Sequence, residues 1–345
     1  MTKTASTVIS PSRRKLLKLG VAGIGAASLG LPMPAIAQRA RVLRFGHMLP
    51  AETIYHRACS KFADEVAALS DGKMKVDVYP ASQLGSIPEM LSNVKSGSQS
   101  FGMAVPAWFS NFIKPMDAFT LPYIVSSPER LKSALDGKVG QKIAEMAEGA
   151  GFETLGYWLM GGRHIVNKVR PVNRPADCVG LKIRTINSQV YIQSFRALGA
   201  STVAMDPSEL YVGLQQGVVD GFEYPLPDLY AYKLYEVAKY LSLDAHTTDF
   251  FMVAANKELY AGFSAEQKAI VQKAMKSAMD FQWTAQPKEI DDALAKLKGV
   301  MNVNDIAHAD KELFIKATRP VYAQFEASIG KDFLDLAVKE LGEPA

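Results

Sequence analysis

Residues 180–225 have the sequence GLKIRTINSQVYIQSFRALGASTVAMDPSELYVGLQQGVVDGFEYP, and this stretch decides the fold class. Its pattern predicts a strand, a turn, a helix, a short strand, a second helix and a further strand. In the first strand, Leu181, Ile183 and Thr185 share one face, so Arg184 leaves the sheet on the other face. This order is typical of an open α/β sheet, in which ligands bind beyond the carboxyl ends of the strands.

Arg184 stands at such a strand end. The planar guanidinium group of an arginine holds a carboxylate through two parallel hydrogen bonds, so a binding site for an organic acid is one interpretation. The other interpretation is an arginine that caps a helix or pairs with an acidic side chain at the surface. Spacing alone leaves both open.

Four short motifs occur in this stretch in a fixed order, namely KIR at 182–184, ALGA at 197–200, GLQQG at 213–217 and VDGFEYP at 219–225. Together they resemble the solute-binding proteins of TRAP transporters, the tripartite ATP-independent periplasmic importers of organic acids. The resemblance extends over nearly all of the chain after about residue 38. It implies a two-lobed periplasmic binding protein fold of class α/β, in which each lobe is a small doubly wound sheet flanked by helices and a long helix spans both lobes.

The resemblance also implies a function. It indicates a binding protein rather than an enzyme, without a cofactor or metal, that holds a small organic acid on Arg184 in a cleft between the lobes. Such a protein delivers its ligand to the small and large membrane subunits of a TRAP permease. The alternatives are an exported enzyme acting on a small carboxylate and a ligand-sensing subunit for a sensor kinase. The enzyme alternative lacks support from motifs, because the sequence contains no GxSxG, HExxH or CxxC.

Further ligand contacts are expected by resemblance. Arg163 lies in a G-x-R-x-x-x-N context and matches a second pocket arginine of the family, although a hinge arginine bonded to backbone carbonyls would fit too. Asn187 matches a position that often contacts the carboxylate, and it is equally suited to cap a helix. Glu223 and Tyr224 follow a predicted strand, and Tyr224 replaces an asparagine that is common in relatives.

Four other side chains are candidates for the walls of the cleft. The aromatic ones are Trp108, Phe222 and Phe250, which could equally belong to the core. His47 ends the first predicted strand, where relatives place ligand contacts, but a lone histidine is often only a satisfied polar residue. Val105-Pro106 and Ser86 stand where sialic-acid-binding relatives have acidic residues, which argues against an amino-sugar acid. Dicarboxylates, hydroxy acids, uronates and aromatic acids all stay open.

The first 37 residues are expected to be an export signal. A basic segment, SRRKLLK at 12–18, precedes an apolar stretch at 19–31 and a small-x-small site at 35–37. The paired arginines resemble a twin-arginine signal, while Leu16 in place of the usual phenylalanine leaves the Sec route open. The protein is therefore expected in the periplasm. Loss of five basic residues with the signal would change the formal net charge from +4 to −1, so no basic surface suited to nucleic acid is expected.

The predicted domain organisation follows from the order of elements. Lobe I is expected to comprise residues 38–160 with about 249–286, and lobe II residues 161–248 with about 287–310. Residues 311–345 are expected to form helices that pack on the lobes, compatible with a monomer or a dimer. Gly161-Gly162 suits a hinge. A capping box at Ser264 and Gln267 predicts the start of the long helix, which Pro287 should kink.

Overall fold

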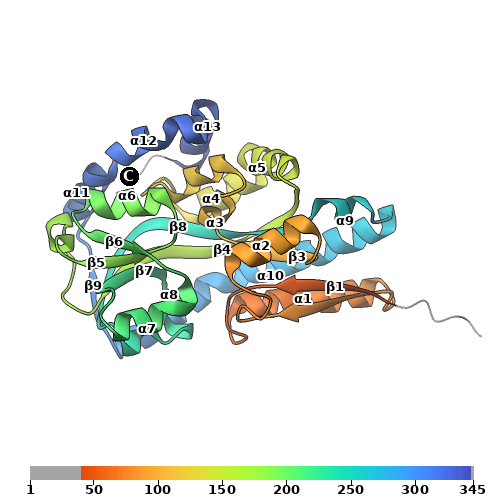
Figure 1. Ribbon diagram of the computed structural model, residues 1–345, viewed down its shortest axis with the longest axis horizontal. Helices are drawn as coiled ribbons and strands as arrows, with labels where there is room; N and C mark the ends of the chain where they lie inside the picture. Colours follow the sequence, from red (N-terminus) through yellow and green to blue (C-terminus); the bar gives the residue numbers. More distant parts are fainter. Residues whose placement is uncertain (1–39, 343–345) are drawn as a thin grey trace, which may run out of the picture. The chain divides into compact units, whose positions relative to one another are not determined.

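A computed structural model describes residues 40–342, and the predicted export signal lies outside this range. One nine-stranded mixed sheet has the order β2-β1-β3-β8-β4-β7-β5-β6, with β9 paired to β8 (Figure 1). The strands are β1 (Arg41–Gly46), β2 (Met74–Tyr79), β3 (Phe101–Ala104), β4 (Phe152–Asn167), β5 (Lys182–Thr185), β6 (Ser201–Ala204), β7 (Gly221–Pro225), β8 (Tyr240–Asn256) and β9 (Asn302–Asp305).

Thirteen α-helices and four short 3-10 helices accompany the sheet within residues 40–342. The α-helices are α1 (Ile54–Leu69), α2 (Ile87–Ser96), α3 (Pro106–Phe109), α4 (Pro128–Asp136), α5 (Lys138–Gly149), α6 (Gln189–Ala197), α7 (Leu210–Gln215), α8 (Leu226–Ala231), α9 (Lys257–Ala261), α10 (Ala265–Lys298), α11 (His308–Thr318), α12 (Pro320–Ile329) and α13 (Lys331–Leu341). The 3-10 helices are η1 (Lys114–Thr120), η2 (Pro175–Cys178), η3 (Pro207–Glu209) and η4 (Leu234–Glu236). None of the helices described combines the length and the apolar composition needed to span a bilayer.

Two groups of three parallel strands form the two lobes. In the first lobe β1 pairs in parallel with β2 and β3, and α1 and α2 make the crossovers, as the sequence predicted. In the second lobe β5 pairs in parallel with β6 and β7, and α6 and α7 make the crossovers. The helices form because each has one apolar stripe to bury; in α1 the stripe contains Tyr55, Cys59, Phe62 and Val66.

Strands β4 and β8 connect the two lobes. They are antiparallel to each other; β8 pairs with β3 at one end, and β4 pairs with β7 at the other. The sequence predicted only short parts of them, at 154–158 and 250–254. A register shift separates Leu159 from Gly161, where φ is +106°. A Cβ at Gly161 would also lie 2.7 Å from Ile290 Cδ1, so the bulge requires glycine.

Helix α10 runs past both lobes, since it contacts α1, β4, α8 and β9 (Figure 1). Its capping box is confirmed: Ser264 Oγ accepts from Gln267 N, and Gln267 Oε1 accepts from Ser264 N. The helix continues past Pro287, where the sequence predicted a kink. Buried Gln282 accepts from Leu159 N at 2.9 Å and donates to Leu159 O at 2.6 Å, which attaches α10 to β4 just before the bulge.

The hydrophobic core consists of two clusters. The smaller one joins β7, α7 and α8 to the last third of α10, for example through Leu214, Phe222 and Leu297. The larger one combines the first lobe with residues of β5 and α6, such as Ile183 and Phe195. Helices α11–α13 add six residues to this larger cluster: Phe314, Val321, Ile329, Leu334, Ala337 and Leu341. The predicted lobe boundaries at 160 and 249 place β5 and α6 in lobe II, whereas these elements share the larger cluster with lobe I. The boundaries therefore stay a prediction.

Replacing Gln282 with alanine should destabilise the protein by roughly 2–4 kcal/mol, because two buried hydrogen bonds to β4 and a filled volume are lost together. Gln324→Ala, at an exposed position of α12, serves as the matched control and should change stability by less than about 0.5 kcal/mol. Urea unfolding followed by circular dichroism measures both. Equal effects of the two substitutions would contradict the anchoring role of Gln282.

Candidate functional site

Arg184 is fully buried at the end of β5. Its Nε and Nη2 atoms both donate to Met205 O, at 2.9 and 2.6 Å, in the segment that follows β6. Its Nη1 atom is also buried and has no hydrogen-bond partner among residues 40–342. Burial lowers the pKa of the Arg184 guanidinium, since desolvation disfavours the charged form. The side chain is thus held by one carbonyl, and its Nη1 donor has no partner among the described residues.

A small cavity lies next to Arg184, at the carboxyl ends of β1, β3, β5, β6 and β7. Its walls come from both lobes and from β4; they are Met48, Leu49, Ile87, Val105, Trp108, Met160, Arg163, Arg184, Ile186, Pro207, Tyr224, Asp228 and Tyr232. The volume is about 30 Å³, room for roughly two water molecules. An organic acid of several carbons therefore enters only if the walls move apart.

Arg163 also lines this cavity, but acidic side chains engage its guanidinium group. Its Nε and Nη2 atoms donate to the two carboxylate oxygens of Glu223, the second at 2.9 Å, and Nη1 donates to Asp249 Oδ2 at 3.3 Å. The rings of Tyr191 and Tyr224 lie 5.6 and 5.5 Å from its Cζ atom. Glu223, which the sequence suggested as a ligand contact, lies behind Arg163 and outside the cavity lining. The arginine–glutamate pair stabilises the wall.

His246 extends this network away from the cavity. Its Nδ1 lies 2.8 Å from Asp244 Oδ2, and its Nε2 lies 3.6 Å from Glu223 Oε2. Burial opposes the charged form, but the charge of Asp244, the hydrogen bond to Asp244 and the nearby charge of Glu223 raise the pKa of His246 to about 9. Burial likewise opposes ionisation of Glu223, but Arg163 and His246 lower its pKa to about 2. The sequence analysis missed this network because Asp244 and His246 lie in an irregular part of β8, where the register shifts between Ser242 and Thr247.

Of the other predicted site residues, two line the cavity and four do not. Trp108 and Tyr224 line the cavity. Asn187 is exposed, and Ser188, not Asn187, occupies the N-cap position of α6. The remaining candidates, His47, Phe222 and Phe250, are buried and do not line the cavity.

Two of these buried residues have clear structural partners. His47 Nδ1 accepts from Leu49 N at 3.2 Å, and its Nε2 lies 3.1 Å from His56 Nδ1. Burial lowers the pKa of His47 to about 3. The ring of Phe250 packs edge-on against Phe119 at a centroid distance of 5.1 Å.

Asp228 is an acidic residue of the cavity wall that the sequence analysis did not identify. It lies in the first turn of α8 and is 1% exposed. Neither carboxylate oxygen has a hydrogen-bond partner in the part of the chain that the structure describes. Burial raises the pKa of Asp228 to about 7, an effect that the charge of Arg163 opposes. An acidic residue in the first turn is common in helices because it favours the helix dipole, so the sequence offered no signal of a cavity position.

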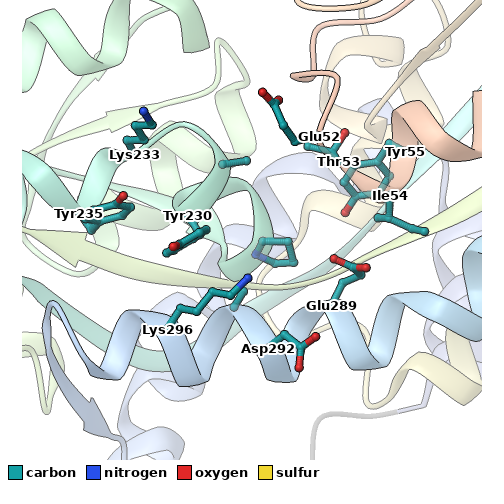
Figure 2. Close-up of a pocket in the computed structure, with 13 residues that line it drawn as sticks. Glu52, Thr53, Ile54, Tyr55, Tyr230, Lys233, Tyr235, Glu289, Asp292 and Lys296 are labelled. Carbon is teal, nitrogen blue, oxygen red and sulfur yellow. The ribbon is translucent and has the colours of Figure 1, made fainter.

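A larger pocket of about 320 Å³ lies where α8, η4 and α10 meet the start of α1 (Figure 2). Its charges are mixed, with Glu52, Glu289 and Asp292 opposite Lys233 and Lys296. Both lysines are exposed. A carboxylate there would compete with water for solvated ammonium groups, whereas the cavity at Arg184 offers a desolvated cation.

A cavity between two α/β lobes that are joined by two long strands, with a buried arginine at its wall, defines a two-lobed solute-binding protein. The sequence profile of the bacterial extracellular solute-binding protein family 7, DctP, matches residues 45–328. The chain belongs to this family, whose members are the solute-binding proteins of TRAP transporters.

Relatives and solved structures agree with this assignment. The chain is 34% identical to the 2,3-diketo-L-gulonate-binding periplasmic protein YiaO of Escherichia coli, over 69% of this chain and 73% of YiaO. The structure of the sugar acid binding protein DctPAm of Advenella mimigardefordensis, in complex with galactonate, superposes with a TM-score of 0.85 at 29% identity, covering 88% of this chain and 98% of DctPAm.

A second solved structure carries a different ligand. It is a TRAP periplasmic solute-binding protein of Sulfurospirillum deleyianum with bound succinate, with a TM-score of 0.82 at 31% identity, covering 86% of this chain and 98% of that one. No cluster of three or more potential metal ligands occurs within residues 40–342.

The raised pKa of His246 predicts a pH dependence of stability. Because folding raises this pKa above its ordinary value, the contribution is fully present below about pH 6.5 and is lost as pH rises toward 9. The loss should be on the order of 3 kcal/mol.

Urea unfolding of the wild type and of His246→Gln between pH 6 and 9.5 tests this. The difference in unfolding free energy between the two proteins should shrink as the pH rises. His308→Gln, at an exposed position of α11, is the control. A constant difference for His246→Gln would contradict the charged network.

Proposed function

We propose that the cavity captures a small organic acid whose carboxylate accepts a hydrogen bond from Arg184 Nη1. The observation that carries this proposal is a fully buried guanidinium group with one unpartnered donor among the described residues, at the wall of a cavity between two lobes. A buried charge is costly unless it is paired, and a carboxylate ligand would pair it. The galactonate and succinate in the related structures are both carboxylates.

Arg163 has a supporting role in this proposal. Its Nε and Nη2 atoms are committed to Glu223, whereas the Nη1 contacts to Asp249 Oδ2 and Met160 Sδ are long, at 3.3 and 3.8 Å. Nη1 is therefore the donor that can turn toward a ligand at low cost. Burial raises the pKa of Asp249 to about 6, so this partner is the less firmly ionised of the two acids. Trp108 and Tyr224 supply the aromatic walls.

Closure of the lobes around the ligand is the second part of the proposal. We place the division at the predicted boundaries, 38–160 with about 249–286 against 161–248 with about 287–310, and we expect the helices of the C-terminal segment 311–345 to pack on the lobes. Bending at the Gly161 bulge of β4 and along β8 and α10 would open the cavity. The small cavity volume supports such a motion, because about 30 Å³ is too small to hold a sugar-sized acid.

Delivery to a membrane permease completes the proposed function. Relatives in the family are periplasmic binding proteins, so we propose export by the signal at residues 1–37 and transfer of the acid to the small and large subunits of a TRAP permease. Family members are binding proteins rather than enzymes, which favours the transport function over the exported-enzyme alternative.

Substitution of Arg184 tests the proposal. Arg184→Ala should weaken binding of a carboxylate by 2–5 kcal/mol, about 30-fold to several thousand-fold, because the ligand charge loses its buried partner. Arg184→Lys should recover part of the loss, since it keeps the charge but not the planar donor group. Lys233→Ala in the pocket of Figure 2 is the matched control and should leave affinity within twofold.

The measurement is a thermal-shift screen of the mature protein, from residue 38, against organic acids and their matched amides. Stabilising acids are then titrated calorimetrically against the variants. A ligand that binds only the folded state raises stability by about 2.7 kcal/mol at a hundredfold excess over Kd. Equal stabilisation by acids and amides, or an Arg184→Ala variant that binds like the wild type, would contradict the proposal.

A further inference from the structure

Asp228 is a second polar group at the cavity wall whose hydrogen-bonding capacity is unused. Its carboxylate is 1% exposed, and both oxygens lack a partner within the described residues. Leaving a buried carboxylate without hydrogen bonds costs several kcal/mol. The position in the first turn of α8 does not account for this cost, because no backbone N–H of the helix donates to the carboxylate.

Two of the neighbouring hydroxyl groups, those of Tyr232 and Tyr55, already have other partners. Tyr232 OH donates to Met48 O at 2.8 Å. Tyr55 OH accepts from Gln286 Nε2 at 2.9 Å, and its own proton faces Met160 O at 3.4 Å. These groups join α8, α10 and the first lobe without satisfying Asp228. A molecule in the cavity that carries a donor can therefore satisfy Asp228.

The charges around the cavity decide which donor fits. Arg163 is paired with Glu223 and Asp249, so a single ligand carboxylate is enough to neutralise Arg184. A second carboxylate would find only Arg163, whose charge Glu223 and Asp249 already compensate, and it would face Asp228, a like charge. An ammonium group would meet the positive charge of Arg163, which acts on Asp228. A neutral hydroxyl donates to a carboxylate without either penalty.

We infer that Asp228 accepts a hydrogen bond from a ligand hydroxyl, so that this site selects hydroxylated monocarboxylic acids, such as sugar acids, over unsubstituted dicarboxylates. The inference rests on the proposed function, in which Arg184 binds the ligand carboxylate. It adds a partner for a hydroxyl group of the same ligand. In this arrangement Arg184 recognises the acid and Asp228 recognises the hydroxyl. Both groups are buried; Arg184 lies at the end of β5, and Asp228 lies in α8, which directly follows the neighbouring strand β7.

Calorimetric titration of the mature protein at pH 8, where Asp228 is ionised, tests the inference with four probes: D-galactonate, D-glucuronate, D-erythronate and succinate. The wild type should bind at least one of the three hydroxylated acids more than tenfold tighter than succinate. Asp228→Asn should weaken binding of that acid by roughly 10- to 100-fold, because a charge-assisted hydrogen bond becomes a neutral one. The same substitution should leave succinate binding unchanged or tighter.

Asp292→Asn, at an exposed acid in the pocket of Figure 2, is the matched control and should change none of the affinities. Thermal unfolding of each variant verifies the fold, and Asp228→Ser provides a second substitution should the asparagine variant misfold. An unchanged ratio of hydroxylated acid to succinate in Asp228→Asn would overturn the inference. Binding of succinate alone would overturn the inference and keep the proposed function, whereas binding of none of the four acids would overturn both.

Discussion

Two guanidinium groups are buried where the lobes of this protein meet, and the structure compensates them unequally. Arg163 is neutralised by Glu223 and Asp249, and His246 and Asp244 extend that network. Arg184 has only the carbonyl of Met205. Burying a cation without an anionic partner is unfavourable, so in the proposed function the affinity for an acid comes from the burial of Arg184 and from its lack of an anionic partner among the described residues.

The sheet topology explains how this arrangement is built. Parallel strands of both lobes end at the same cavity, which therefore receives residues that directly follow β1, β3, β5, β6 and β7. The long strands β4 and β8 carry Arg163 and Asp249 across the junction. Helix α10, attached to β4 through Gln282 and Gln286, holds the two lobes together on one side. In the proposed motion, these three elements bend and thereby change the cavity.

Much of this architecture could be predicted from the sequence. Periodicity and turn residues identified both parallel groups and the capped start of α10, and the motif around Arg184 identified the family. The length of β4 and β8 could not be predicted, because Gly161 and Gly162 interrupt the apolar pattern and a bulge absorbs them only in the folded sheet. Asn187 matched a family position, yet Ser188 occupies the N-cap position of α6 and Asn187 is exposed. Asp228 and the partners of Arg163 depend on contacts between distant strands, which local spacing does not reveal.

The most direct test of the account is a crystal structure of the mature protein with the acid that stabilises it most. The account predicts a carboxylate oxygen within about 3 Å of Arg184 Nη1, the ordinary length of a charge-assisted hydrogen bond. The ligand should lie between the lobes and be enclosed by Trp108 and Tyr224. A carboxylate bound by Lys233 or Lys296 in the pocket of Figure 2, with Arg184 Nη1 still unpaired, would contradict the account.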